Sequence, residues 1–238
     1  MITVVVKNDD EAAMCHPEKQ LDTPTAQNNR IDRRISLIRR DFLKLIPWLL
    51  LSPSALAASD PLRHQPPAIK LINAAREQLG VTLLYDPAYV RLAYPEGDPS
   101  PDKGVCTDVI IRAYRRAFGY DLQYMVHEDM RRHFGAYPKI WGLKRPDTNI
   151  DHRRVPNLQT FLKRKNAELK VSKNPLDYKP GDLVTQLIGN KLPHIVIVSD
   201  RKSQDDSRNL VIHNIGGGTQ EEDYLFGSPI TGHYRFFP

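Results

Sequence analysis

Three apolar, β-branched runs near the end of the chain constrain its fold more than any other feature of the sequence. They are Leu183-Val184, Ile195-Val196-Ile197-Val198 and Leu210-Val211-Ile212. Runs of this composition, set off by turn residues such as Pro180-Gly181-Asp182, are typical of β-strands. The sequence therefore predicts strands at residues 183–188, 194–199 and 209–214, and a terminal strand at residues 234–236.

Helical spacing of apolar residues dominates the part of the chain before these strands. It predicts helices at residues 68–80, 106–118, 122–134 and 156–166. Gly80 and Gly119 end the first two helices, as glycine commonly does. Helices followed by strands with turn-rich links indicate an α+β fold with an antiparallel sheet. We expect the 106–118 helix to pack on this sheet, and the strand that begins at His194 to lie beside the strand that ends at His213.

Residues 39–58 have the pattern of an export signal. Arg39-Arg40 is followed by an apolar stretch from Leu45 to Leu51 and by the small-x-small box Ala55-Leu56-Ala57. A basic region, a short apolar region and such a box make a secretory signal, and the arginine pair is similar to the twin-arginine motif. The stretch is too short for a membrane span. We therefore predict a leader at residues 1–57 that uses the twin-arginine export machinery, cleavage near Ala57/Ala58, and a single periplasmic domain at residues 58–238.

Charge and cysteine content exclude several classes of protein. Lys plus Arg is 34 and Asp plus Glu is 28, which gives a net charge of +6. This excess is spread along the chain, so it favours an anionic polymer over nucleic acid as a partner. The only cysteines are Cys15 and Cys106, too few for a disulfide scaffold or a Cys-rich zinc site. We predict no metal and no other cofactor.

Cys106 lies where a loop rich in glycine and proline, residues 86–104, enters a predicted helix. Unpaired N–H groups and the helix dipole at such a position lower the pKa of a thiol and favour the reactive thiolate. A thiolate that attacks an amide also needs a base. His194 and His213 lie at strand ends that meet if the two strands pair, so one imidazole can orient the other.

Two polar clusters have two interpretations each. The side chains of Asp151, His152, Arg153 and Arg154 either bind a substrate carboxylate or form a salt-bridged structural loop. The cluster His127-Glu128-Asp129 is a metal site or, more simply, a solvated helix surface.

The order of these motifs resembles the NlpC-type papain-like cell-wall hydrolases. A closer resemblance is to a bacterial family known as domain of unknown function 1287, which belongs near that superfamily. The segments that carry it are residues 104–115, 126–130, 149–158, 213–218 and 230–235.

The resemblance implies a papain-like fold and a role for each site residue. Cys106 is then the nucleophile, His194 the general acid and base, and His213 the residue that orients His194. Tyr85 is similar to the tyrosine beside the oxyanion site. Asn214 takes the place of His213 if the strand register differs by one residue.

These expectations lead to three hypotheses on function. The first is an exported cysteine amidase or peptidase that hydrolyses amide bonds in peptidoglycan stem peptides. The second is a cell-wall-binding module of the same fold that has lost turnover. The third is a periplasmic metal-binding protein that uses its histidines, namely His127, His152, His194, His213 and His233.

Overall fold

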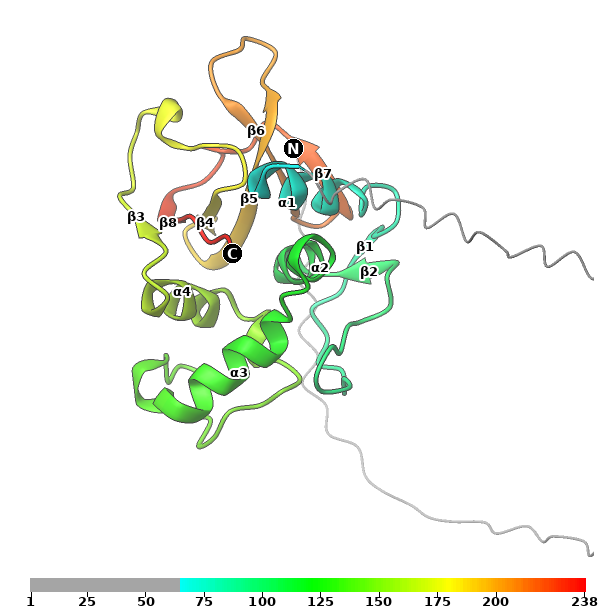
Figure 1. The fold of residues 1–238 in the computed structure, drawn as a ribbon, viewed down its shortest axis with the longest axis vertical. Helices are drawn as coiled ribbons and strands as arrows, with labels where there is room; N and C mark the ends of the chain where they lie inside the picture. Colours follow the sequence, from blue (N-terminus) through cyan, green and yellow to red (C-terminus); the bar gives the residue numbers. More distant parts are fainter. Residues whose placement is uncertain (1–64) are drawn as a thin grey trace, which may run out of the picture. The chain divides into compact units, whose positions relative to one another are not determined.

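The structure is a computed structural model that describes residues 65–238 (Figure 1). The predicted leader, with its arginine pair and cleavage box, lies outside the described residues. Within residues 65–238, no helix combines the length and apolar character needed to cross a membrane.

Four α-helices lie close to their predicted positions. They are α1 (Pro67–Arg76), α2 (Cys106–Phe118), α3 (Leu122–His133) and α4 (Val155–Arg164), and the short 3-10 helices are η1 (Phe134–Ala136), η2 (Asp151–Arg153) and η3 (Pro175–Asp177). The prediction for the first helix was too long. After Arg76 the chain makes tighter i→i−3 bonds, from Gln78 N–H to the Ala75 carbonyl and from Leu79 N–H to the Arg76 carbonyl, and these end the α-helix.

The main sheet is six-stranded and antiparallel, with strand order β3-β8-β4-β5-β6-β7. Its strands are β3 (Glu168–Leu169), β4 (Leu183–Ile188), β5 (Leu192–Lys202), β6 (Asn209–Asn214), β7 (Thr219–Glu222) and β8 (Ile230–Tyr234). The α+β class, the antiparallel sheet and the pairing of β5 with β6 are therefore confirmed. A small parallel pair, β1 (Leu84–Tyr85) with β2 (Lys103–Gly104), closes the long loop before α2.

The predicted terminal strand at residues 234–236 was wrong, because the last strand, β8, ends at Tyr234. It lies inside the sheet, between β3 and β4. At Gly232 this strand has no room for a side chain, since a Cβ there would lie 2.3 Å from the Tyr234 hydroxyl and 2.7 Å from that of Thr185. The glycine interrupts the apolar pattern and hides the strand in the sequence.

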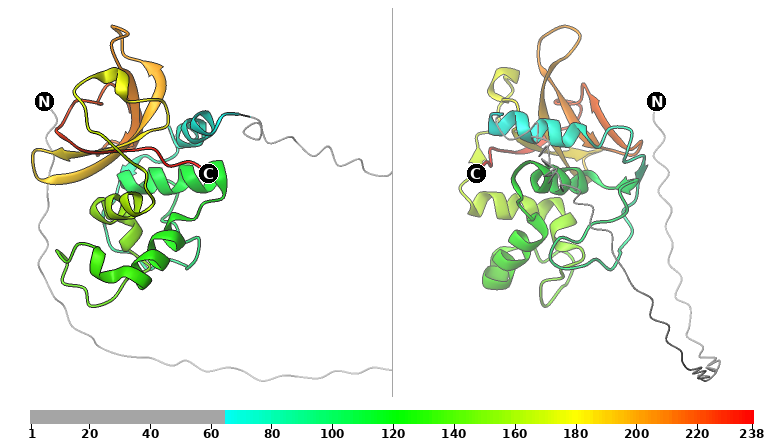
Figure 2. Two further views of the ribbon diagram at one scale, coloured as in Figure 1. Left: turned by 60° about the vertical axis from the view of Figure 1, so that its left-hand side comes forward. Right: turned by 45° about the vertical axis from the view of Figure 1, so that its right-hand side comes forward.

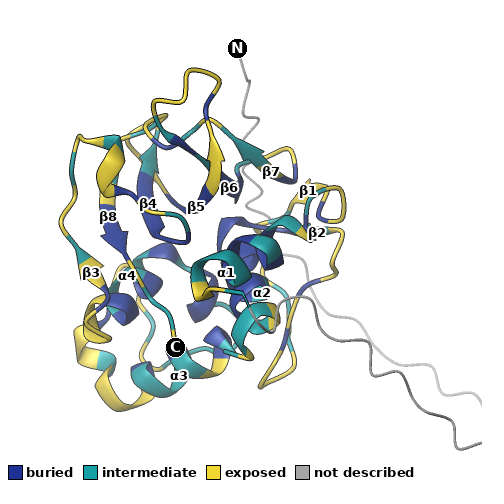
Figure 3. Cartoon of the chain, turned by 45° about the horizontal axis from the view of Figure 1, so that its top comes forward, coloured by how far each residue is buried: buried dark blue, intermediate teal, exposed yellow. Residues whose placement is uncertain are grey.

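Two apolar cores occupy the two faces of the sheet. The larger one joins α1, α2 and α4 to Ile195, Ile197 and Ile212 of the sheet. The smaller one contains Val196, Val198 and Val211 with the loop residue Leu225. The helices α2, α3 and α4 gather beside the sheet (Figure 2), and α2 is largely buried between its neighbours (Figure 3).

The ends of α2 are defined by two residues. Asp108 accepts a hydrogen bond of 2.7 Å from the Val105 N–H, which fixes the chain as it enters the helix. Gly119 ends the helix in the left-handed conformation, with φ of 68°, as the sequence predicted. Cys106 is thus the first residue of α2, a helix whose start is fixed by Asp108 and whose end is fixed by Gly119.

Candidate functional site

The sulfur of Cys106 touches the beginning of β5. Cys106 is only 3% exposed, and its sulfur accepts a hydrogen bond from the backbone N–H of Ile195, with further contacts to the N–H groups of Thr107 and of Cys106 itself. Ile195 directly follows His194. The packing of α2 on the sheet therefore brings the nucleophile candidate to the strand residue next to the base candidate.

Burial controls the protonation state of this sulfur. Burial raises the pKa of the Cys106 thiol to about 12, with the nearby Asp108 carboxylate acting in the same direction and the surrounding N–H groups in the opposite one. The expected lowering of the pKa by the helix start is therefore outweighed, and the expectation of a resting thiolate was wrong. At neutral pH the sulfur is a thiol, which needs a base before it can attack.

The two strand histidines lie together, as predicted. His194 Nε2 lies 2.8 Å from His213 Nδ1, and His213 Nε2 lies 2.8 Å from a carboxylate oxygen of Glu222. Burial, together with the neighbouring His213, lowers the pKa of His194 to about 3, so His194 is neutral at physiological pH.

The hydrogen-bond chain assigns the tautomers of both rings. In the state in which both rings are neutral, the Glu222 carboxylate accepts from His213 Nε2, and His213 accepts at Nδ1. His194 must then donate from Nε2, which leaves its Nδ1 with a free lone pair. This nitrogen has no hydrogen-bond partner among the described residues. In this tautomer His194 presents its acceptor at Nδ1, and its lowered pKa makes the ring a weak base in the resting protein.

Cys106 and the histidine chain approach β5 from different sides. Ile195 packs with α2 in the larger core, whereas Val196 packs with Leu225 in the smaller one. Side chains alternate along a strand, so His194 lies on the side of Val196. Within residues 65–238, no hydrogen bond joins the sulfur of Cys106 to either imidazole. Proton transfer therefore requires the His194 ring to approach the sulfur around the beginning of the strand.

A cavity of about 200 Å³ opens at Cys106. Its lining residues are Tyr85, Pro87, Val105, Cys106, Trp141, Ile150, Arg153, Arg154, Val155, Pro156 and Pro193. The first residues of two helices, α2 and α4, face this space. Tyr85, to which the resemblance assigned oxyanion support, is 41% exposed and lines the cavity together with Cys106.

Asn214 holds the backbone around this cavity instead of bonding His194. Its side-chain amide donates to the carbonyl of Gly104 at 3.0 Å and to that of Leu84 at 3.3 Å. It thereby clamps β1 against β2, next to Tyr85 and Cys106. His213, and not Asn214, is the residue that contacts His194.

Arg153 is bound within the protein. Its guanidinium donates twice to Asp108, at 2.9 Å each, and to the carbonyls of Ala88 and Asp86. Both side chains of the pair are buried, at 2% and 1% exposure. Arg153 therefore joins η2 to the first turn of α2 and neutralises the carboxylate that lies near the sulfur.

The other three residues of that predicted cluster have separate surroundings. Arg154 lines the cavity, donates to Asp151 at 3.2 Å and lies over the ring of Trp141 at 4.2 Å. Asp151 is buried and also accepts from the Asp147 N–H. His152 is buried outside the cavity lining, and its burial lowers its pKa to about 4.

Sequence reasoning missed Glu222 and Trp141. Glu222 lies in a polar segment, Thr219–Glu222, that carries no strand composition. The glycines at residues 216–218 do signal the hairpin, and its register pairs His213 with Gln220. Glu222 is two residues further along β7, on the same face as Gln220, and this diagonal position was the available signal.

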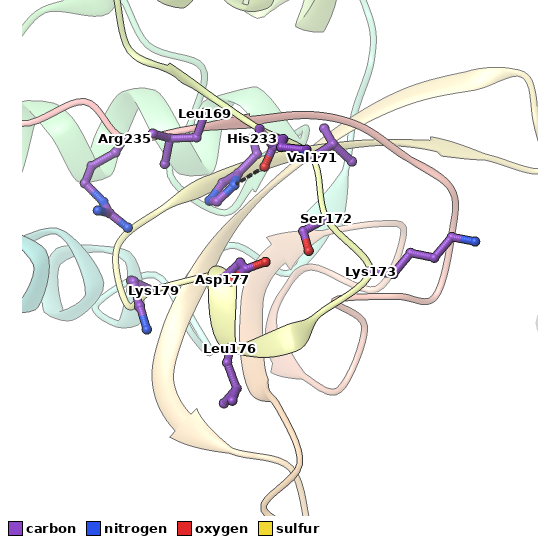
Figure 4. A pocket seen from close by; sticks show the side chains of 10 residues that line it. Leu169, Val171, Ser172, Lys173, Leu176, Asp177, Lys179, His233 and Arg235 are labelled. Atoms are coloured by element: carbon purple, nitrogen blue, oxygen red, sulfur yellow. Dashed lines mark hydrogen bonds between the residues drawn. The ribbon is translucent and has the colours of Figure 1, made fainter.

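A second cavity, of about 610 Å³, is larger but lacks a comparable pair of groups. It lies between β3, β8 and the segment that carries Lys173 and Lys179 (Figure 4). Its histidine, His233, bonds Asp182 at 2.7 Å and the Lys170 carbonyl at 3.2 Å. The cavity at Cys106 is therefore the candidate active site.

The described part of the chain contains no cluster of side chains suited to bind a metal ion. Within residues 65–238, no three His, Cys, Asp or Glu side chains are grouped to hold an ion. Glu128 bonds Arg131 and Arg132, while Asp129 bonds Arg164 and Tyr137. The carboxylates of the His127-Glu128-Asp129 cluster are therefore paired with arginines and with the buried Tyr137.

Comparison with known proteins gives one family. The profile of the family described as "Domain of unknown function (DUF1287)" matches residues 72–236. A protein of Escherichia coli (strain K12), "Uncharacterized protein YijF", is 54% identical over 169 residues, which make up 71% of this chain and 82% of that protein. The family match spans every residue of the candidate site.

Proposed function

This chain belongs to the DUF1287 family, and we propose that it is an exported cysteine amidase or peptidase that hydrolyses amide bonds in peptidoglycan stem peptides. We also propose that its α+β fold is of the papain-like NlpC type, with the cysteine at the start of a helix that packs on an antiparallel sheet. The periplasm, the predicted location of the mature chain, is where this anionic polymer lies.

The observation that carries the proposal is the meeting of α2 and β5. The sulfur of Cys106 bonds the N–H of Ile195, the residue after His194, and His194 begins a chain that ends at Glu222. The base, the orienting imidazole and the carboxylate then form one hydrogen-bonded chain that begins at the residue next to the one the sulfur contacts, and Cys106 itself lines the cavity.

The reaction proceeds through a thioester. His194 Nδ1 accepts the Cys106 proton while the sulfur bonds the amide carbonyl carbon. The Cys106 N–H and the Tyr85 hydroxyl donate to the developing oxyanion. The C–N bond breaks as His194 returns the proton to the leaving amine. A water molecule then gives a proton to His194, attacks the acyl group and releases the thiol.

Digestion of purified muropeptides, with identification of the products by mass spectrometry, tests this function. The expected result is a pair of fragments, one with a new carboxyl group and one with a new amine, whose masses add up to the substrate plus one water. The raised thiol pKa favours one alternative, a cell-wall-binding module without turnover. In that case muropeptides bind and are recovered intact.

We expect Glu222→Gln to lower kcat by about tenfold to a hundredfold and to leave KM nearly unchanged. The carboxylate stabilises the charge that His194 gains in the transition state, and it acts through His213. Steady-state rates on a muropeptide measure both constants.

The matched control for this variant is Glu221→Gln on the same strand. Glu221 bonds Arg76, Ser199 and Arg201 and has no contact with the histidines. Equal losses of kcat in the two variants would assign Glu222 a purely structural role.

We expect the double change Arg39→Lys and Arg40→Lys to stop export and to leave the precursor inside the cell. The motif requires the guanidinium pair, and lysine keeps only its charge. Cell fractionation and N-terminal sequencing measure the outcome, with Ala58 as the expected mature N-terminus. Periplasmic protein of unchanged amount in the double variant would contradict the twin-arginine prediction.

A further inference from the structure

Two adjacent arginines line the cavity at Cys106, and they differ in the hydrogen bonds that they make within the protein. Arg153 donates to both oxygens of Asp108 and to two backbone carbonyls, so little of its hydrogen-bonding capacity remains. Arg154 makes a single hydrogen bond, from Nη1 to Asp151. Its Nε and Nη2 have no hydrogen-bond partner within residues 65–238 and are not among the buried unsatisfied atoms. Arg154 therefore retains donors that a ligand can use.

Trp141 holds the guanidinium of Arg154 in place. The Arg154 Cζ lies 4.2 Å from the centre of the indole ring, a distance typical of cation–π stacking. Stacking occupies the face of the guanidinium and leaves the N–H groups at its edge available. The side chain is 18% exposed, so the group is partly shielded from water.

The two arginines of the cavity also differ in how their charges are compensated. Arg153 is neutralised by Asp108. Arg154 shares one hydrogen bond with the buried Asp151, and the charges of Asp151 and Asp147 both act on it, but neither carboxylate occupies its Nε or Nη2. Asp147 is bonded to Tyr89 and Asn149. The rest of the lining is largely apolar, which strengthens any ion pair formed there.

We propose that Arg154 is an anion subsite beside Cys106, positioned by Trp141 and Asp151, that binds a carboxylate of the substrate. The substrate class is an acylated amino acid or peptide whose free carboxylate lies close to the amide bond that the sulfur attacks. The free N–H groups at the edge of a guanidinium can form two parallel hydrogen bonds to the two oxygens of a carboxylate. This arrangement gives both affinity and a fixed orientation of the ligand. The identity of the substrate rests on the proposed function, but the two tests below do not require turnover.

The first test compares two alkylating reagents on the full chain at one pH. Both reagents alkylate the sulfur, which displaces iodide. Iodoacetate carries a carboxylate, and iodoacetamide carries a neutral amide in its place. We expect Arg154→Gln to lower the iodoacetate-to-iodoacetamide rate ratio at Cys106 by about fivefold, as for a partly screened charge pair. Peptide mass spectrometry reads Cys106 separately from Cys15. Arg131→Gln, which removes an exposed arginine of α3, should leave the ratio unchanged.

The second test needs no reaction at the sulfur. Trp141 and Trp48 are the only tryptophans, so Trp48→Phe makes the fluorescence specific to Trp141. We expect N-acetylglycine, but not its amide, to change this fluorescence in a saturable way, and Arg154→Gln to abolish the change. Equal responses to acid and amide, or an unchanged response in Arg154→Gln, would overturn the subsite even if Cys106 resists alkylation.

These outcomes distinguish the subsite from the hydrolase. Arg154-dependent binding without any muropeptide product would refute turnover and keep the subsite. Muropeptide products from a chain whose alkylation ratio and fluorescence response ignore Arg154 would keep the hydrolase and refute the subsite. If the iodoacetate-to-iodoacetamide rate ratio fell equally in Arg131→Gln, the effect would be due to the net charge of the protein, and the subsite would also be refuted.

Discussion

Replacement of Cys106 by serine should reduce hydrolysis of muropeptides by about a thousandfold or more. A serine hydroxyl gives up its proton far less readily than a thiol, and no neighbouring residue compensates for that difference. The burial that raises the thiol pKa to about 12 makes the hydroxyl still harder to activate. Product formation from a defined muropeptide, followed by chromatography, measures the loss.

Two companion variants complete this experiment. His194→Ala should be nearly as damaging, because it removes the nitrogen that accepts the proton, whereas Cys15→Ser changes a residue of the predicted leader and should keep full activity. His213→Ala should have a milder effect than either, since water can replace part of its orienting bond. If Cys106→Ser hydrolysed muropeptides at the wild-type rate, the proposed mechanism would be excluded.

Replacement of Arg153 by methionine should lower the free energy of unfolding by about 3–5 kcal/mol. The change leaves the Asp108 carboxylate buried without its partner, and it also removes the donors to the carbonyls of Ala88 and Asp86. Equilibrium unfolding in urea measures the difference. The start of α2 should loosen first, because Asp108 also caps it.

The double variant Asp108→Asn with Arg153→Met tests the cause. An asparagine oxygen can still accept from the Val105 N–H, and no buried charge remains, so part of the lost stability should return. Arg131→Met on the exposed surface of α3 provides the control and should change stability by less than about 0.5 kcal/mol. A loss below about 1 kcal/mol in Arg153→Met would show that the pair contributes little.

The elements that sequence predicted well are those in which pattern and packing agree. The helix at Cys106–Phe118 and the strands β4 and β6 have the predicted bounds, because apolar residues at regular spacing meet one core in each case. Strands β1, β2, β3 and β7 escaped prediction. They have two to four residues, and their pairing partners, rather than their composition, make them strands.

The candidate site was predictable in its residue types and less so in its geometry. The pairing of two strands was enough to bring His194 to His213, since hydrophobic pattern determines register. The different roles of Arg153 and Arg154 could not be predicted in this way, because the sequence places two identical side chains next to each other. Only the position of the buried Asp108, which pairs with Arg153, distinguishes them. The raised thiol pKa was equally hidden, since it arises from burial by segments distant in sequence.

The position of β8 inside the sheet has a consequence for biosynthesis. While residues 230–234 are still inside the ribosome, β8 is missing from the sheet. One edge of β4 is then unpaired, and β3 has no partner strand. Open edges of this kind promote association between nascent chains. The sheet is therefore completed only after residues 230–234 have left the ribosome. A stop codon that removes the last ten residues would produce an aggregating chain, even though Cys106, His194 and His213 would all be present in it.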